Sequence, residues 1–470
     1  MINLANCNQI HCIGIGGIGV SAIAEILLSR GKTVTGSDMK ESAMTDRLIE
    51  QGAIVYLGHR EKNVEGADLV IYTNAVSTDN PELKRAKELG IPAVTRAEAL
   101  GALMTEYSYS IAISGTHGKT TTTSMVSLIL KRAAFDPTIL VGGTLSELGG
   151  NVAVGKGEYF VTEACEYMDS FLSLSPKIEI ILNIDSDHLD YFKDINHITR
   201  SFDKFASYVP QDGMIVAYDA NPFVHSVIKG KPGVVTFGLS DNCDYFAENI
   251  EWTDEGRPVF DVCTGGEGKE KKRLGRVQLA VPGEHNILNA LAAFACCHRL
   301  DAPVDVIIET LHEFTGTDRR FDITGTTEAG VQVIDDYAHH PTEIKATLAA
   351  ASNIPHNLLW CCFQPHTYTR TLALFDQFAD AFADADVLVL AEIYAAREKN
   401  IYKISSEKLA EEIRSKHPSK AVVFIPTFEE IADYVYEHAE KGDVVLTMGA
   451  GDIYKVGELI LNKDFEEIKK

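Results

Sequence analysis

A glycine-rich stretch that begins at Gly115 carries residue types that could hold the phosphates of a nucleotide. It reads Gly-Thr-His-Gly-Lys-Thr and ends at Thr120. The apolar run 111–113 before it predicts a buried strand, and the apolar spacing after it predicts a helix over TTTSMVSLILKRA. Glycines let backbone N–H groups approach phosphate oxygens, and a helix N-terminus favours negative charge. Lys119 would reach the β- and γ-phosphates, and Thr120 would bind Mg²⁺.

The match to the usual P-loop pattern is incomplete. The pattern GxxxxGK[ST] requires glycine at position 113, where this chain has Ile113, so the loop is a shorter one that starts at Gly115. The alternative interpretation is a tight strand-to-helix turn that carries a surface lysine. Gly-Lys-Thr between a predicted strand and a predicted helix favours the nucleotide loop.

A second glycine loop lies near the N-terminus. A predicted strand over residues 9–15 leads into GIGGIG, and a further predicted strand ends at Asp38, about 20 residues beyond the glycines. This is the fingerprint of dinucleotide binding, and alone it would suggest an NAD enzyme. A glycine loop at a helix N-terminus accepts any diphosphate, however, including that of a nucleotide-sugar. The fingerprint glycines are Gly14, Gly16, Gly17 and Gly19.

Further βα units follow this loop and predict a small open parallel sheet that ends near residue 107. Ligands of such sheets bind at the carboxyl ends of the strands. Each polar residue at such an end is, taken alone, more often a surface or turn residue. The candidates at these ends are His59, Thr73, Asn74 and Arg96.

Two predicted strands of the central region also end in candidate metal ligands. Glu163 follows the strand 160–162, and His188 follows the buried strand 178–184. The ends of parallel strands lie side by side, so both side chains could converge on the nucleotide phosphates. A carboxylate suits Mg²⁺ well. Histidine is a less usual Mg²⁺ ligand, and the alternative for His188 is a surface loop residue.

The rest of the chain changes character twice. Residues 240–280 alternate strand-like runs with turns and predict antiparallel strands. In the helix that follows, Asn286 and Asn289 are three residues apart and share one face, where carboxamides could contact an adenine edge. The alternative is simple helix capping. A third α/β region carries Asp336 at a strand end, and His366 and Arg370 after another strand.

Composition narrows the classes of partner. The chain has 470 residues, which predicts about three domains. Its net charge is −24 and its pI is near 5.0, whereas a nucleic-acid-binding surface would be basic. A few lysines, arginines and helix ends can still form a positive pocket for a small anion.

The nine cysteines show no metal-ligand spacing, and the adjacent pairs 296–297 and 361–362 lie in apolar segments that predict buried reduced thiols. The N-terminus lacks the charged region, apolar core and cleavage site of a signal peptide. No apolar run is long enough to span a bilayer. We therefore expect a cytoplasmic protein without membrane insertion.

Many motifs along the whole chain together resemble one family, the Mur ligases. They occur in this order: GIGGIGVSAIAEIL, GTHGKTT, EACEYMDSFL, NIDSDHLDYF, PGEHNILNALAA, TDRRFD, DDYAHHPTEI, QPHTYTR and MGAGDI. The resemblance implies three α/β domains. They are a Rossmann-like UDP-substrate domain (1–107), a central P-loop-like ATPase domain with a parallel sheet and a smaller antiparallel sheet (108–317), and a Rossmann-like C-terminal domain that binds the amino acid (318–470).

The resemblance also implies roles for individual residues. The ATP contacts would be Gly115, Thr116, His117, Gly118, Lys119, Thr120, Thr121, Asn286, Asn289, Arg320 and Asp336. Thr120 and Glu163 would bind one Mg²⁺, and His188 a second. The first glycine loop would hold the diphosphate of UDP rather than NAD, together with Asp38, His59, Thr73, Asn74 and Arg96. His366 and Arg370 would line the muramoyl and amino-acid site.

The implied reaction is the ATP-dependent ligation of L-alanine to the lactyl carboxylate of UDP-N-acetylmuramic acid. The carboxylate is phosphorylated to an acyl phosphate, and the amine of alanine then displaces phosphate. The implied catalytic residues are Lys119, Glu163, His188, Arg320 and Arg370. Binding of three substrates on three domains predicts domain closure. The sequence identifies no base for the amine and does not predict an oligomeric state.

Two departures from the family pattern restrict these roles. Better-known relatives have a carbamylated lysine near the second metal, but the equivalent stretch here, TRSFDKFA, has no lysine at that position, so Lys204 is not given the role. The acidic motif has Cys165 and Glu166 where many relatives have Asp-Glu, so Glu163 is the expected metal carboxylate and Glu166 has no assigned role.

Three other functions remain as alternatives at this point. A ligase of the same family that attaches recovered peptide to UDP-muramic acid in cell-wall recycling shares most of the motifs. An NAD-dependent oxidoreductase would use the first glycine loop but leaves GTHGKT unexplained. A nucleotide switch or binding module would use the P-loop but leaves Asp336 and Arg370 without a role.

Overall fold

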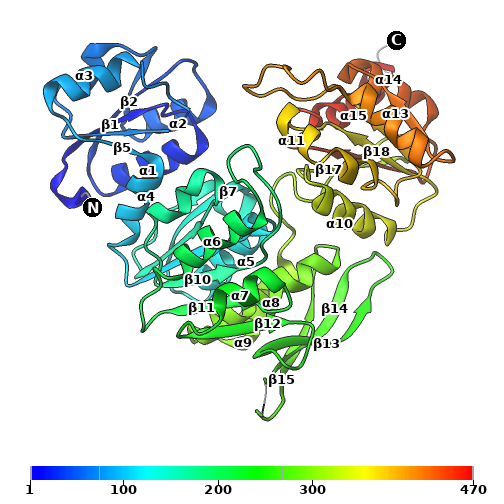
Figure 1. The fold of residues 1–470 in the computed structure, drawn as a ribbon, viewed down its shortest axis with the longest axis horizontal. Helices are drawn as coiled ribbons and strands as arrows, with labels where there is room; N and C mark the ends of the chain where they lie inside the picture. Colours follow the sequence, from blue (N-terminus) through cyan, green and yellow to red (C-terminus); the bar gives the residue numbers. More distant parts are fainter. Residues whose placement is uncertain (1–2, 74, 267, 468–470) are drawn as a thin grey trace. The chain divides into compact units, whose positions relative to one another are not determined.

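Three β-sheets, each flanked by helices, make up the α/β fold of the protein (Figure 1). The structure, a computed structural model, describes residues 3–73, 75–266 and 268–467. Contacts within the chain define two compact units. The first unit comprises residues 1–183, 199–236 and 292–303, and the second comprises residues 184–198, 237–291 and 304–470.

The first sheet has five parallel strands in the order β3-β2-β1-β4-β5. In chain order the strands are β1 (Gln9–Ile13), β2 (Thr33–Asp38), β3 (Ile54–Leu57), β4 (Leu69–Tyr72) and β5 (Ala93–Thr95). The helices are α1 (Ile18–Ser29), α2 (Ala43–Glu50), α3 (Pro81–Leu89) and α4 (Arg96–Met104), with 3₁₀ turns η1 (Leu4–Asn6) and η2 (Glu61–Val64). This strand order places the ends of β1 and β2 side by side, so the first glycine loop and Asp38 are neighbours.

Local sequence explains where these helices begin. The side chain of Asn80 accepts hydrogen bonds from the first turn of α3, and Pro81 occupies its first position, where a missing N–H costs nothing. Thr95 and Glu98 form a capping box at the start of α4. The cap places Arg96 in the first turn of α4, at the end of β5.

The second sheet has ten strands in the order β15-β14-β13-β12-β11-β10-β6-β9-β7-β8. The strands nearest the P-loop are parallel: β6 (Tyr109–Ser114), β7 (Thr138–Leu145), β9 (Tyr159–Glu163), β10 (Ile178–Ile181) and β11 (Met214–Tyr218). The other strands are β8 (Gly150–Ala153), β12 (Val234–Gly238), β13 (Tyr245–Trp252), β14 (Pro258–Thr264) and β15 (Lys272–Gln278). The helices are α5 (Lys119–Arg132), α6 (Ile195–Ala206), α7 (Pro222–Ile228), α8 (Glu284–Arg299) and α9 (Val304–Glu313), with turns η3 (Ser146–Leu148) and η4 (Tyr167–Ser173).

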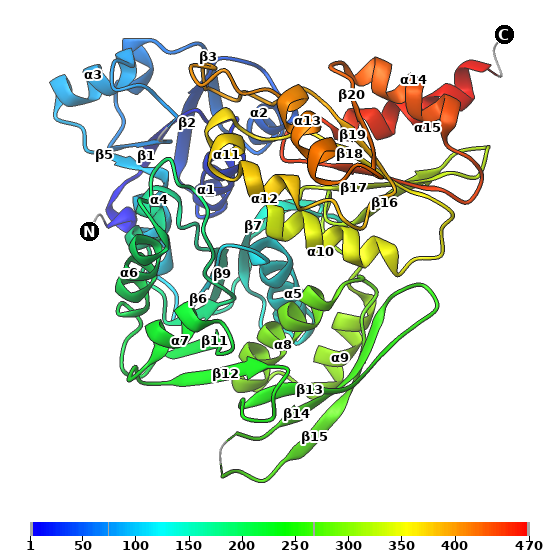
Figure 2. The same cartoon turned by 45° about the vertical axis from the view of Figure 1, so that its right-hand side comes forward.

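The antiparallel strands expected between residues 240 and 280 are present as β13, β14 and β15 (Figure 2). They do not form a separate sheet, because β13 pairs in parallel with β12 and so extends the ten-stranded sheet. The strand expected over 178–184 is shorter, since β10 ends at Ile181 and the chain then bends into the loop that follows.

The third sheet has the order β16-β17-β21-β18-β19-β20, with only β16 antiparallel. Its strands are β16 (Asp322–Thr326), β17 (Gln332–Asp336), β18 (Leu359–Phe363), β19 (Val387–Leu390), β20 (Ala421–Phe424) and β21 (Val444–Met448). Its helices are α10 (Pro341–Ser352), α11 (Tyr368–Ala373), α12 (Phe375–Ala379), α13 (Ser406–Lys416), α14 (Phe428–His438) and α15 (Tyr454–Glu467).

Both faces of this third sheet are buried, as the continuous apolar runs of its strands predict. Trp360 and Cys362 pack with α14 and α15, whereas Cys361 and Phe363 pack with α10 and α13. The alternation follows from the two-residue period of a strand. It also separates the two adjacent cysteines onto opposite faces, and both are free thiols, as expected.

Among the described residues no helix is both long and apolar enough to cross a membrane.

Candidate active site

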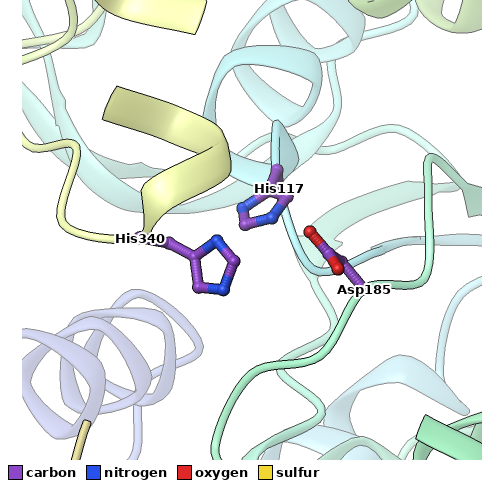
Figure 3. Close-up of side chains that lie close together, drawn as sticks. All are labelled: His117, Asp185 and His340. Carbon is purple, nitrogen blue, oxygen red and sulfur yellow. The ribbon is translucent and has the colours of Figure 1, made fainter. Parts of the chain in front are cut away.

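The loop between β6 and α5 has the backbone conformation that its glycines permit. Gly115 has φ +137° and Gly118 has φ +85°, in the region that favours glycine. A Cβ atom at Gly115 would lie 3.0 Å from the Cβ atom of Leu182, so a larger residue there would crowd Leu182 as well as strain the backbone. His117 lies in this loop just before α5 (Figure 3). The N–H groups of the first turn of α5 provide the donors of an anion site.

Asn183 holds the same loop in place. The N–H of Thr116 donates to the Asn183 carbonyl over 3.2 Å, and the N–H of His117 donates to its Oδ1 over 2.8 Å. The Asn183 Nδ2 donates back to the carbonyl of His117 over 3.0 Å. Sequence reasoning assigned no role to Asn183. Its only signal was its place two residues beyond β10, beside the P-loop strand.

Lys119 is folded back onto its own loop. Its Nζ donates to the carbonyls of Gly115 and Thr116 over 2.5 and 3.0 Å, and lies 3.0 Å from Glu166 Oε2. Burial alone would lower the pKa of Lys119, but the negative charge of Glu166 outweighs it, and the pKa is raised above its usual value. Lys119 is therefore a charged group, held by a carboxylate at the position that sequence reasoning left without a role.

Thr120 and Glu163 lie beside the same pair of glycines in β7. The Gly142 N–H donates to Glu163 Oε1 over 2.7 Å, and a Cβ atom at Gly142 would come within 2.7 Å of Oε2. A Cβ atom at Gly143 would lie 3.4 Å from the Thr120 methyl group. Glycine at both positions thus lets the side chains of Thr120 and Glu163 pack closely against β7, and a hydroxyl and a carboxylate are oxygen donors that fit Mg²⁺.

The first glycine loop is closed by Asp38 and Arg96. Gly14 has φ +77°, and the Gly16 N–H donates to Asp38 Oδ2 over 2.9 Å. A Cβ atom at Gly19 would lie 2.7 Å from the Arg96 Cδ atom, so glycine is needed for the side chain of Arg96 to cross this helix end. A Cβ atom at Gly14 would lie 3.3 Å from the Thr73 methyl group. Three of the predicted contacts, Asp38, Thr73 and Arg96, therefore surround this loop.

A cavity of about 360 Å³ in the first unit connects the two predicted sites. One wall carries the first glycine loop and Arg96, and the other carries β7 and the end of β9. The lining residues are Gly17, Ile18, Gly19, Val20, Thr73, Arg96, Leu140, Val141, Gly142, Glu163 and Cys165. A ligand in this cavity would contact a cation at one side and the predicted metal carboxylate at the other.

The Nδ1 edge of His59 faces buried groups of the first sheet. Its Nδ1 lies 2.9 Å from Ser37 Oγ and 3.1 Å from Glu82 Oε2, and Glu82 is fully buried. Glu82 was not identified from the sequence. Asn74, the remaining predicted contact of this region, lies outside the described residues.

In the second unit, His188 belongs to a cluster around Asp187. His188 has φ +53°, and its Nε2 lies 3.7 Å from Asp187 Oδ2. Arg370 donates from Nε to Asp187 Oδ1 over 3.1 Å and lies 3.2 Å from His366 Nδ1 through Nη1. Burial alone would raise the pKa of Asp187, but the charge of Arg370 lowers it well below its usual range. The structure thus brings His188, His366 and Arg370 together through a residue that the sequence did not single out.

His366 is held as a neutral ring. It stacks on Tyr394 with ring centroids 5.3 Å apart. Burial, helped by the positive charge of Arg370, lowers the pKa of His366 to about 4. The start of α10 lies nearby in this unit. His340, directly before that helix (Figure 3), bonds through Nε2 to the Ser186 carbonyl over 3.0 Å, and Thr342 Oγ1 donates to Asp185 Oδ2 over 2.8 Å.

Asp336 is buried at the end of β17 and is bound by backbone groups. Oδ2 accepts from the Phe321 N–H and Oδ1 from the Ala338 N–H, each over 2.7 Å. Burial raises the pKa of Asp336 to about 6, although the charge of Arg320 opposes the rise. The Arg320 guanidinium lies over the Tyr337 ring, 5.0 Å from its centroid. Asp336 therefore anchors the segment that carries Arg320.

Asn286 and Asn289 are both buried and share one face of α8, as the three-residue spacing predicts. Asn286 Nδ2 donates to the Pro282 carbonyl over 2.6 Å, and Asn289 Nδ2 donates to Asn286 Oδ1 over 3.0 Å. In both bonds an asparagine Nδ2 donates to an oxygen, whereas an N-cap accepts from a helix N–H, so neither bond is the capping interaction that sequence reasoning kept as the alternative.

Comparison with known proteins identifies the family. Three family profiles match the chain: "Mur ligase family, catalytic domain" over residues 9–108, "Mur ligase middle domain" over 113–297, and "Mur ligase, glutamate ligase domain" over 319–451. The UDP-N-acetylmuramate–L-alanine ligase of Clostridium acetobutylicum is 52% identical over 456 residues, which is 97% of this chain and 98% of that protein. The enzyme of the same name from Caldanaerobacter subterraneus is 49% identical over 464 residues, 98% of this chain and 99% of that protein.

Solved structures agree with this result. The crystal structure of UDP-N-acetylmuramate-alanine ligase MurC from Thermotoga maritima matches with a TM-score of 0.80 at 31% identity, covering 98% of this chain and all of that one. A murein peptide ligase from Psychrobacter arcticus matches with a TM-score of 0.70 at 25% identity, covering 97% of this chain and 98% of that one. With these matches over nearly its whole length, and with the two glycine loops in place, the chain belongs to the Mur ligase family.

Proposed function

We propose that this protein ligates L-alanine to the lactyl carboxylate of UDP-N-acetylmuramic acid, with ATP as the phosphoryl donor. The observation that carries the proposal is the cavity of about 360 Å³ in the first unit. There a glycine loop and Arg96, suited to a diphosphate, face Glu163 of the P-loop sheet. The relatives of nearly equal length, about half identical to this chain, carry the name of that reaction.

The proposed ligation has two steps. A lactyl carboxylate oxygen attacks the γ-phosphorus of ATP, and the bond to the β-phosphate oxygen breaks to release ADP. The amine of alanine then attacks the acyl carbon, loses a proton, and expels inorganic phosphate. Since such phosphoryl transfers depend mainly on positioning and on charge stabilisation, the cations around the phosphates are the main catalytic groups.

The nucleotide side uses the P-loop. We assign the phosphates to the loop Gly115–Thr121, with donors from the first turn of α5, and to Lys119, which the γ-phosphate would draw away from Glu166. Thr120 and Glu163 would hold one Mg²⁺ and His188 a second, and bound Mg²⁺ neutralises charge on the transferred phosphoryl group. Asn286 and Asn289 would contact adenine. Arg320, anchored through Asp336, would contribute a further positive charge.

The other predicted site residues would bind the acceptor substrates. Gly14–Gly19, Asp38, His59, Thr73 and Arg96 would bind the UDP moiety. Arg370 and His366 would bind the alanine carboxylate and the muramoyl group, with Asp187 fixing the guanidinium. We place the corresponding domain limits at residues 1–107, 108–317 and 318–470.

The test is the release of phosphate from ATP in four mixtures of UDP-N-acetylmuramic acid and L-alanine, each present or absent. The proposal predicts rapid release only with both substrates, and formation of a hydroxamate when hydroxylamine replaces alanine, because hydroxylamine traps an acyl phosphate. Release that requires a tripeptide in place of alanine would instead assign the protein to peptide recycling. ATP hydrolysis that ignores both acceptors would reject ligation.

A further inference from the structure

A buried glutamate organises the loop that carries His59. Glu82 lies in the first turn of α3 and is fully buried. Its Oε2 accepts from Ser37 Oγ over 2.6 Å and lies 3.1 Å from His59 Nδ1. Its Oε1 accepts from Asn63 Nδ2 over 2.6 Å and from the Arg60 N–H over 3.3 Å. The segment between β3 and β4 is therefore wrapped around one carboxylate.

This carboxylate is charged. Burial alone would raise the pKa of Glu82, but the polar groups of His11, Ser37 and Asn63 around it lower the pKa to about 2. A charged carboxylate offers only acceptors, so every group within hydrogen-bond distance of it must donate.

The protons of the cluster can then be assigned. The hydroxyl of Ser37 has one proton, and Glu82 takes it across the 2.6 Å contact. Nδ1 of His59 faces the carboxylate and the lone pairs of the same hydroxyl, which are both acceptors. Nδ1 must therefore carry a proton, and in the neutral ring Nε2 is the unprotonated nitrogen. This arrangement fixes one tautomer of His59 by geometry.

His59 lies at the edge of the sheet where a nucleotide would bind. The Ser37 carbonyl accepts from the N–H groups of Gly14 and Ile15 over 2.8 and 3.1 Å, and the Gly58 N–H donates to the Asp38 carbonyl over 2.7 Å. The loops after β1, β2 and β3 are thus neighbours. In such sheets the diphosphate lies at the β1 loop and the nucleoside extends toward β2 and beyond. His59, after β3, is on the nucleoside side.

We propose that Glu82 is a positioning residue for nucleoside recognition: it holds His59 with Nδ1 protonated, so that Nε2 accepts a hydrogen bond from a donor group of the uridine of the substrate. This inference rests on the proposed function, because it takes the uridine diphosphate sugar as the ligand of the first glycine loop. His59 contacts the ligand, and Glu82 acts only through His59.

The first test needs no ligand. In the full-length protein with ¹⁵N-labelled histidine, two-dimensional NMR reports which ring nitrogen of His59 carries the proton, with the signal assigned by its loss in His59→Phe. Wild type should show the Nδ1–H tautomer in alkaline buffer. Glu82→Gln offers a donor where the carboxylate accepted, and should shift His59 toward the Nε2–H tautomer. A wild-type Nε2–H tautomer would overturn the proposal without any variant.

The second test is UDP binding measured by calorimetry. Glu82→Gln should weaken it about 10-fold, the typical worth of one hydrogen bond. The matched control is Glu88→Gln, an exposed glutamate of the same helix paired with Arg85, which should leave the affinity unchanged. In the His59→Phe background, Glu82→Gln should have no further effect. If wild type binds UDP and either Glu82→Gln leaves the affinity unchanged or its effect persists without His59, Glu82 does not act through His59. If wild type fails to bind UDP, the proposed function itself fails.

Discussion

Two buried glutamates, Glu82 near the first glycine loop and Glu179 near the second, differ in the number of hydrogen bonds that their carboxyl groups accept. In the first sheet Ser37 donates to Glu82, and in the second sheet Ser114, the residue before Gly115, donates to Glu179 over 2.9 Å. Both carboxyl groups are fully buried. Glu82 has further donors around both oxygens, whereas Oε2 of Glu179 has no hydrogen-bond partner among the described residues.

The two groups therefore ionise differently. Hydrogen bonds lower the pKa of Glu82 to about 2 against the effect of burial, while burial raises the pKa of Glu179 to about 8 with only Ser114 and Lys231 opposing it. Both side chains are closed to solvent, but Glu179 lies deeper and has fewer donors, so burial dominates its pKa while hydrogen bonds dominate that of Glu82. The first loop lies beside a fixed negative charge, and the second lies beside a group that is neutral until about pH 8.

The largest expected effect tests the difference between the loops themselves. Only the second loop carries a lysine, and removal of one preorganised charge contact typically costs about 10²–10³ in rate. Lys119→Ala should lower the ligation rate by this factor and leave the binding of the UDP substrate intact. Initial rates and calorimetry measure the two effects, with the exposed Lys156→Ala as the control. Equal loss of UDP-substrate binding would contradict separate sites.

The next effect concerns Glu179 and pH. Its folded-state pKa is above the unfolded value of 4.5, so its contribution to stability is complete below about pH 4.5 and is lost as pH rises toward 8. The loss is about 1.4 kcal/mol per pH unit at most. Glu179→Gln removes this titration, so the variant should gain stability relative to wild type between pH 5 and pH 8. Urea unfolding at several pH values measures this gain. If the free energy of unfolding changes with pH in the same way in both proteins, Glu179 is not a neutral acid in the folded state.

Glu82 should show the opposite sign. Its folded-state pKa is below the unfolded value, so its contribution is present above about pH 4.5 and is lost as pH falls toward 2. Glu82→Gln leaves donors of the cluster without an acceptor and should destabilise the protein at pH 7 by about 1–3 kcal/mol. The same urea series measures it. If both glutamine variants change stability in the same direction at pH 8, the contrast between the two sheets is wrong.

Sequence reasoning located the parts of both sites that depend on local pattern. Glycine loops, strand ends and helix starts are set by neighbouring residues, so Asp38, Glu163 and Asp336 were expected at strand ends and each is the last residue of its strand. The fold class followed from the same patterns. The expected antiparallel strands are present, but they continue the ten-stranded sheet, because the pairing of β12 with β13 that joins the two parts has no signature in either strand.

The partners of these residues could not be predicted, because they come from distant parts of the chain. Glu166 reaches Lys119 across 47 residues, and Glu82 reaches Ser37 across 45. Glu179 stands in the apolar run IEII, where a strand pattern gives no sign that its carboxyl group turns inward to Ser114. Asp187 belonged to a motif that had been recognised, but its link to Arg370 spans 183 residues.

The smallest expected effect concerns NADH, which should not bind to the first glycine loop. The first loop carries the glycines and the acidic residue of an NAD site, yet both oxygens of Asp38 already accept backbone N–H groups, from Gly16 over 2.9 Å and from Met39 over 2.7 Å. The cavity beside the loop leads to Glu163. We therefore expect no saturable binding of NADH at millimolar concentration, followed by its fluorescence, whereas UDP-N-acetylmuramic acid should raise the unfolding temperature. Saturable NADH binding that no UDP-sugar displaces would show that the first loop is a dinucleotide site. The two glycine loops would then not differ as a substrate loop and a phosphoryl-transfer loop.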